Sequence, residues 1–248
     1  MMVATVVVGR SDSVSATFED GTPGPFAVAG QVDFPDDPTS TGHGRVARMR
    51  YSAYKTPVEI NSSLVFRPAP TFGLGSTVFF RGDLLFPSGT YNFNNPGVDR
   101  KLVALRATGV QADSGKRDLY VVLHLYGCGL LVEWSENPSG SACRFDRMSL
   151  GRWYHIEMQV TVNHAMAAND GAVRLWVDDS LVFEQMQIRM TNPAWRGRPV
   201  WFMWAVGEQR RSADFYGNAD ISEGGSIDED RYWDNVAFGT TRERRSKR

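Results

Sequence analysis

The 248-residue chain is poor in the features that mark several common protein classes. It contains two cysteines and four histidines, too few for a disulfide-stapled scaffold or a zinc-rich fold. No run approaches the roughly 18 consecutive apolar residues of a membrane-spanning helix, so we expect no membrane partner. The start of the chain lacks a basic segment followed by a long apolar run. It predicts a protein made without a secretory signal, or one whose signal has been removed.

The two cysteines, Cys128 and Cys143, flank a segment, LLVEWSENPSGSA, that is typical of a strand followed by a turn. A hairpin there would bring the two sulfur atoms face to face, so a disulfide is one interpretation. Two unpaired thiols are the other, and the absence of an export signal favours them. Neither cysteine has neighbours typical of a metal site or a nucleophile.

Long amphipathic helices are absent from the pattern, and apolar residues instead alternate with polar ones along the whole chain. In segment 153–163, for example, Tyr154 and Ile156 share one face while His155 and Glu157 share the other. Similar strands are expected at 13–18, 45–51, 77–86, 101–107, 118–126, 130–134, 172–177, 200–206 and 232–238. We therefore predict an all-β protein, a two-sheet antiparallel β-sandwich.

No linker or internal repeat divides the chain, so we expect one sandwich domain over 13–240, with an N-terminal arm, 1–12, and a C-terminal tail, 241–248. The net charge of −1 hides an asymmetry, because the last seven residues, RERRSKR, hold five basic side chains and one acid. The tail would bind an acidic neighbouring subunit through Arg242, Arg244, Arg245, Lys247 and Arg248. A solvated tail is the alternative. Nucleic acid is not an expected partner, because no strand has a basic face and no phosphate-binding loop occurs.

A family resemblance is carried by six segments in order: FEDGTPGPF, GHGRVARMRY, STVFFRGDLLFPSGT, RWYHIEMQVTVN, DGAVRLWVDDSLVFE and RYWDNVAFGT. Over most of residues 13–240 the chain resembles concanavalin A-like jelly rolls. The branch it resembles holds alginate, glucuronan and heparin lyases and their non-catalytic, laminin-G-like relatives. The resemblance implies a jelly roll with one curved sheet, whose concave face forms a groove for a glycan.

Lyases of this branch neutralise a uronate carboxylate, remove the C5 proton with a Tyr or His, and protonate the leaving oxygen. By resemblance, Arg81 would be the carboxylate clamp and His124 or Tyr126 the base. The chain departs from the alginate lyase pattern, because it lacks the RxELR motif and the QIH tripeptide. The nearest counterpart of QIH is Val122-Leu123-His124, which lacks the glutamine.

Glycan binding without catalysis needs aromatic platforms and hydrogen-bonding groups. The candidates are Tyr120, His124, Tyr126, Arg81, Asp83 and Trp134. Trp201 and Trp204 are further aromatics, but they fall on opposite faces of their strand, so one of them belongs to the core. The Glu-x-Asp-x-x-Glu motif that many hydrolases of this broad fold carry is missing, so hydrolysis through paired carboxylates is not expected.

The resemblance also implies a structural Ca²⁺ on the convex side, which joins an early acidic residue to a late aspartate. Glu19 and Asp234 stand at those places, and a backbone carbonyl near Gly44 would complete an oxygen shell. The alternative is a cap and a turn, with Asp20-Gly21 as the turn residues and Asp234 hydrogen-bonded to the backbone.

We therefore expect a non-enzymatic jelly-roll module that binds a glycan or a neighbouring protein surface. Its setting would be a virion, another assembly or homo-oligomer, or the cytoplasm. The alternative is a polysaccharide lyase that cleaves uronate-containing chains by β-elimination.

Overall fold

The computed structural model describes residues 13–51, 63–66, 73–88, 100–108, 120–126, 129–135, 137–145, 148–190, 201–206 and 229–242. These residues form fifteen strands, and the predicted all-β class is confirmed. In the same residues we find no helix with the length and apolar character needed to cross a membrane. The predicted division into arm, domain and tail stays a prediction, because residues 1–12 and 243–248 lie outside the described part.

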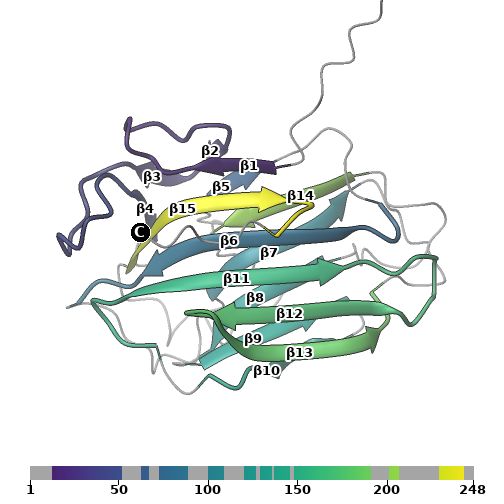
Figure 1. Ribbon diagram of the computed structural model, residues 1–248. Helices are drawn as coiled ribbons and strands as arrows, with labels where there is room; N and C mark the ends of the chain where they lie inside the picture. The colour runs from purple at the N-terminus through teal and green to yellow at the C-terminus, as the bar shows by residue number, and fades with distance from the viewer. Residues whose placement is uncertain are drawn as a thin grey trace, which may run out of the picture.

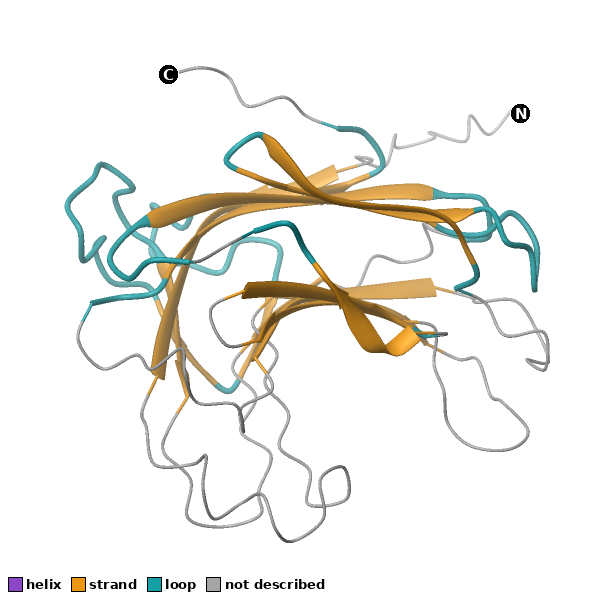
Figure 2. Ribbon diagram, turned by 90° about the horizontal axis from the view of Figure 1, so that it is seen from below, coloured by secondary structure: helices purple, strands orange, loops and turns teal. Residues whose placement is uncertain are grey.

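The strands form two stacked sheets, and each strand is antiparallel to its hydrogen-bonded neighbours (Figures 1 and 2). The eight-stranded sheet contains, in spatial order, β13 (Ser180–Ile188), β12 (Gly171–Val177), β11 (Trp153–Thr161), β6 (Thr77–Leu85), β15 (Glu229–Gly239), β4 (Ala47–Tyr51) and β3 (Gln31–Asp33), with β1 (Ser13–Ala16) paired to the second half of β15. The seven-stranded sheet contains β10 (Asn137–Ala142), β9 (Gly129–Trp134), β8 (Tyr120–Tyr126), β7 (Arg100–Thr108), β14 (Trp201–Val206), β5 (Ser63–Phe66) and β2 (Ala27–Ala29).

The core lies between the sheets and is filled by alternate side chains of their strands. On β6, Phe80 and Leu84 are fully buried in it, and Gly82, between them, leaves room for the indole of Trp233. A Cβ atom at Gly82 would lie 3.1 Å from Cε3 of Trp233, closer than ordinary van der Waals contact allows. The residues that alternate with these, such as Asp83, therefore point away from the core, onto the outer face of the eight-stranded sheet.

A charged side chain also crosses the core. Arg231 of β15 is fully buried, and its Nη1 donates a hydrogen bond to the carbonyl oxygen of Lys101, 3.2 Å away on β7 of the other sheet. This contact ties the two sheets together through a buried cation, which a protein retains only when its donors are satisfied.

The loop between β3 and β4 covers part of the outer face of the eight-stranded sheet. It brings Val46 into a small apolar cluster with Leu85 and Tyr232, and Trp153 packs against this cluster. The cluster is separate from the main core and fixes the loop on the sheet.

Five strands were not predicted from the sequence: β2, β3, β5, β10 and β13. The NPSG segment, predicted as a turn, forms most of β10, which pairs irregularly with β9 at the edge of its sheet. An edge strand tolerates the proline, because one side of it has no partner strand. β13 was not predicted, because Val182 and Phe183 are both buried and irregular pairing with β12 breaks the alternation.

Candidate functional site

Three neighbouring strands bring polar side chains together on the outer face of the eight-stranded sheet. Asp83 of β6 lies directly opposite His155 of β11 on one side and directly opposite Asp234 of β15 on the other. All three side chains face away from the core, since core residues precede or follow each of them along its strand. Asp83 and Asp234 are each only 2% exposed. We call these residues, with His43, the His/Asp cluster.

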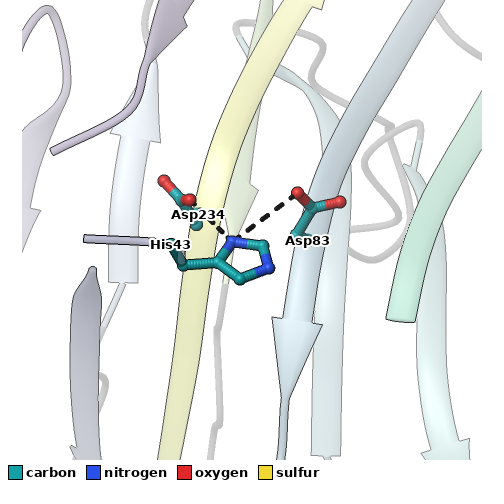
Figure 3. Close-up of side chains that lie close together, drawn as sticks. All are labelled: His43, Asp83 and Asp234. Carbon is teal, nitrogen blue, oxygen red and sulfur yellow. Dashed lines mark hydrogen bonds and ion pairs between the residues drawn. The ribbon is translucent and has the colours of Figure 1, made fainter. Parts of the chain in front are cut away.

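The fourth member comes from the covering loop. His43 Nδ1 lies 2.8 Å from Oδ2 of Asp234 and 4.0 Å from Oδ2 of Asp83 (Figure 3). Because both neighbours are hydrogen-bond acceptors, we assign a proton to this nitrogen. The imidazole therefore stands as a donor between two carboxylates that face each other across two strands.

The remaining carboxylate oxygens also have partners. His155 Nδ1 lies 2.7 Å from Oδ1 of Asp83. The side-chain amide of Asn235 donates to Oδ2 of Asp83 at 2.7 Å and to Oδ2 of Asp234 at 3.0 Å, and its backbone N–H donates to Oδ1 of Asp234. Asn235 has a φ of +50° and lies in an irregularity of the β15–β6 pairing. Such a bulge turns a side chain toward a site that a regular strand could not serve.

Burial and charge act against each other in this cluster. Burial alone would lower the pKa of His43, but the hydrogen bond to Asp234 and the charges of Asp234, Asp83 and Asp37 raise the pKa above its ordinary value. Burial raises the pKa of Asp234, helped by the charge of Asp83 and opposed by the hydrogen bond and charge of His43. A positive His43 thus compensates buried negative charge.

The loop that presents His43 is itself held by hydrogen bonds to Asp37. The carboxylate of Asp37 accepts from the backbone N–H and the hydroxyl of both Thr39 and Thr41. Burial would raise the pKa of Asp37, but these four hydrogen bonds outweigh it and lower the pKa to about 2. Trp153 supports the loop from below, because its Nε1 donates to Thr39 Oγ1 at 3.1 Å and its ring stacks on His43 with 4.1 Å between centroids.

The outer face of the seven-stranded sheet carries a second polar group. His124 of β8 alternates with core residues Leu123 and Leu125, so it faces outward, and it is 7% exposed. Its Nε2 lies 2.9 Å from Oε2 of Glu133 on β9, an ion-pair distance. Lys101 of β7 lies directly opposite His124, which puts the two residues on the same face.

The structure corrects the predicted grouping of Arg81 with His124. Arg81 lies on β6 and His124 on β8, so they face outward from two different sheets and do not converge. Trp134, predicted as a glycan platform, packs in the main core instead. The side chains of Tyr120 and Tyr126 lie outside the described part of the structure, as do those of Trp201 and Trp204.

The residues predicted for calcium are only partly brought together. The carboxylate of Glu19 lies against Gly44, where an added Cβ would be 2.2 Å from Oε2, and it accepts the N–H of Arg45 at 3.2 Å. The carboxylate of Asp234 accepts hydrogen bonds from His43 and Asn235 instead. The calcium shell stays a prediction.

The first basic residue of the tail binds its own domain. Arg242 donates to both carboxylate oxygens of the buried Glu157, at 2.8 and 2.7 Å, and its guanidinium lies over the ring of Trp176. Residues 244, 245, 247 and 248 lie outside the described residues. Cys143 is a free thiol whose pKa burial raises to about 12. Cys128, its partner in the disulfide interpretation, is not in the described part.

The two stacked antiparallel sheets are arranged as in concanavalin A-like jelly rolls, so the fold implied by the resemblance is confirmed. No protein-family model matches the sequence, and no curated protein matches it. Solved structures do match over most of the chain, and most of them are alginate and glucuronan lyases.

An endo-β-1,4-glucuronan lyase from the fungus Trichoderma reesei matches 87% of this chain and 90% of its own, with 16% identity and a TM-score of 0.64. Alginate lyase Aly36B matches 94% of this chain and 99% of its own, with 12% identity and a TM-score of 0.60. Alginate lyase vAL-1 from Chlorella virus matches 88% and 95%, with 11% identity and a TM-score of 0.54. A variant of Aly36B was solved with an alginate trisaccharide. At these identities the shared property is the fold.

The expectation of a non-enzymatic module is corrected by these comparisons. Most of the solved structures that share the fold over most of the chain are polysaccharide lyases. A bacteriophage carbohydrate esterase and a botulinum neurotoxin binding domain also share it. The number of lyases among the matches favours the lyase alternative. A structural or virion role has no support in the comparisons, and the location of the protein stays a prediction.

Proposed function

We propose that the chain is a polysaccharide lyase that cleaves a uronate-containing glycan by β-elimination, with His124 at the reacting centre. The observation that carries the proposal is the fold shared, over 87–94% of the chain, with lyases of two different uronate polymers, glucuronan and alginate. Two described residues on the outer face of the seven-stranded sheet, His124 and Lys101, offer a base and a cation for this reaction.

Charge favours this face over the His/Asp cluster. The substrate carries a carboxylate on each uronate, and Asp83 and Asp234 would repel it. Around His124, the described neighbours include an ammonium group, Lys101, directly opposite in the sheet, which would attract the substrate carboxylate.

In the proposed reaction, an imidazole nitrogen of His124 accepts the C5 proton of the uronate. The electron pair of the C5–H bond forms the C4–C5 double bond, the C4–O bond breaks, and the leaving oxygen takes up a proton. Lys101 would neutralise the substrate carboxylate while negative charge develops beside it. Glu133 lies 2.9 Å from His124 Nε2 and would orient the ring, as a third group orients a catalytic base. We propose Tyr126, two residues along β8, as the proton donor to the leaving oxygen.

The test is incubation with alginate, glucuronan and heparin, with the absorbance of the unsaturated product as readout. We expect turnover with at least one polymer, and a loss of about 100-fold or more in His124→Ala, the usual size of a general-base contribution. The matched control is His164→Ala. His164 also contacts a carboxylate, Asp170, but both side chains are exposed in a loop, so activity should be unchanged. No product from any of the three polymers, or full activity in His124→Ala, would refute the proposal.

A further inference from the structure

We propose that His43, Asp83 and Asp234 form a binding site for one divalent transition-metal ion of the zinc type. The donor atoms of these three residues all lie within 4.8 Å of one another. They come from three segments far apart in the sequence: the covering loop, β6 and β15 (Figure 3). The proposal does not depend on lyase activity.

The spacing of the donor atoms fits a small ion. Three ligands at 2.0–2.2 Å from a tetrahedral zinc ion are separated from one another by about 3.4 Å. His43 Nδ1 lies 2.8 Å from the Asp234 oxygen and 4.0 Å from the Asp83 oxygen, so the mean of these two distances is close to that separation. Side-chain shifts of less than about 1 Å would therefore complete the site, and the fourth ligand would be water.

The charge of the site also fits a cation. Asp83 and Asp234 are directly opposite each other on neighbouring strands and are both almost fully buried, although like charges in that position destabilise a sheet. A divalent ion would balance both carboxylates at once. It would take the place of the proton on His43 Nδ1, and that proton would leave to solvent, so the site exchanges one positive group for another.

The surrounding residues are of the kind that hold metal ligands in place. His155 donates to the Asp83 oxygen that would not bind the ion, and Asn235 donates to the second lone pair of each oxygen that would. Trp153 stacks on the ring of His43. Outer contacts of this sort fix the orientation of imidazole and carboxylate ligands and raise their affinity for metal. The side chain of His43 is 15% exposed, which leaves the ion a route from solvent.

The donor set selects among ions. One imidazole and two carboxylates suit Zn²⁺ and related transition metals, whereas Ca²⁺ prefers six to eight oxygen ligands. This site shares Asp234 with the calcium shell predicted on Glu19, Gly44 and Asp234, but its other two ligands and its preferred ion are different. Separate titrations with Zn²⁺ and with Ca²⁺ therefore tell the two sites apart.

The experiment is calorimetric titration of the chelator-treated protein with Zn²⁺ and, separately, with Ca²⁺. We expect one Zn²⁺ per chain, and a rise in melting temperature of about 5–10 °C at a Zn²⁺ concentration of one hundred times Kd. Ca²⁺ should not compete. The variant Asp83→Asn keeps the shape of the side chain but should lose this Zn²⁺ binding and the thermal shift.

His43→Gln is a second variant, in case Asp83→Asn does not fold, and circular dichroism checks both. The matched control is His164→Ala, which removes an exposed His/Asp contact and should bind Zn²⁺ as the unchanged protein does. Absence of stoichiometric Zn²⁺ binding would overturn the proposal. So would equal binding in a folded His43→Gln or Asp83→Asn protein, or loss of binding in His164→Ala alone.

Discussion

Replacement of Asp37 by asparagine should destabilise the protein by about 2 kcal/mol at neutral pH. An asparagine oxygen can still accept the two hydrogen bonds from Thr39, but its NH₂ group cannot accept the two from Thr41. The two lost hydrogen bonds to this partly buried carboxylate contribute about 1 kcal/mol each. The pKa gives a similar figure, because a fall from 3.8 to about 2 corresponds to at most about 2.4 kcal/mol.

The same reasoning fixes the pH dependence. The pKa of Asp37 is lower in the folded protein than in the unfolded chain, so its contribution is complete above about pH 4 and is lost as the pH falls toward 2. Urea unfolding of both proteins at about pH 6, 4, 3 and 2 measures the difference in the free energy of unfolding. This difference should shrink from about 2 kcal/mol to near zero across that range.

Asp36→Asn is the matched control, because the neighbouring Asp36 side chain is 93% exposed and its loss should change stability by less than about 0.5 kcal/mol. A difference between Asp37→Asn and the unchanged protein that stays constant down to pH 2, or that is absent at pH 6, would refute the assigned role of Asp37.

Two further substitutions test the packing of the eight-stranded sheet. Gly82→Val should cost about 2–3 kcal/mol of unfolding free energy, because the added methyl groups meet Trp233. Gly73→Val, at a position with nothing within 4 Å of an added Cβ, should be close to neutral, and equal costs would contradict this account of the core. Arg242→Ala should cost about 1–2 kcal/mol, because it leaves the buried Glu157 without its two-pronged partner. Arg242→Lys keeps the charge but loses the paired hydrogen bonds of the guanidinium, so it should lose about half as much unfolding free energy as Arg242→Ala in the same urea assay. A lysine variant as stable as the unchanged protein would show that the paired hydrogen bonds to Glu157 do not contribute.

The sequence predicted the central strands well because alternation and burial agree there. On β11 the outward residues His155 and Gln159 alternate strictly with buried apolar ones, so the pattern is simple to detect. It fails where burial does not alternate, as at Val182 and Phe183 of β13. It fails also at β10, whose residues favour turns but are held by pairing with β9.

The candidate sites were harder to predict, for a topological reason. Alternation tells the outer face of a strand from its core face, but a sandwich has two outer faces. That is why Arg81 and His124 were placed together in the prediction, although they lie on different sheets. His43 was missed because it lies in a glycine-flanked loop with no pattern, and its contact with Asp234 spans 191 residues. The repeated combination of His and Asp on outward positions was the available signal.

The separation between Arg231 and Asp234 on β15 has a consequence for how this protein can vary. The two residues are three positions apart, an odd number, so their side chains point to opposite sides of the sheet. Arg231 enters the core and reaches the carbonyl of Lys101, the residue opposite His124, while Asp234 joins the His/Asp cluster. Deletion of a single residue between them would turn one of these charged side chains to the wrong side of the sheet. Substitutions can alter either surface separately, whereas a change of length within this strand disturbs the polar contacts on both sides at once.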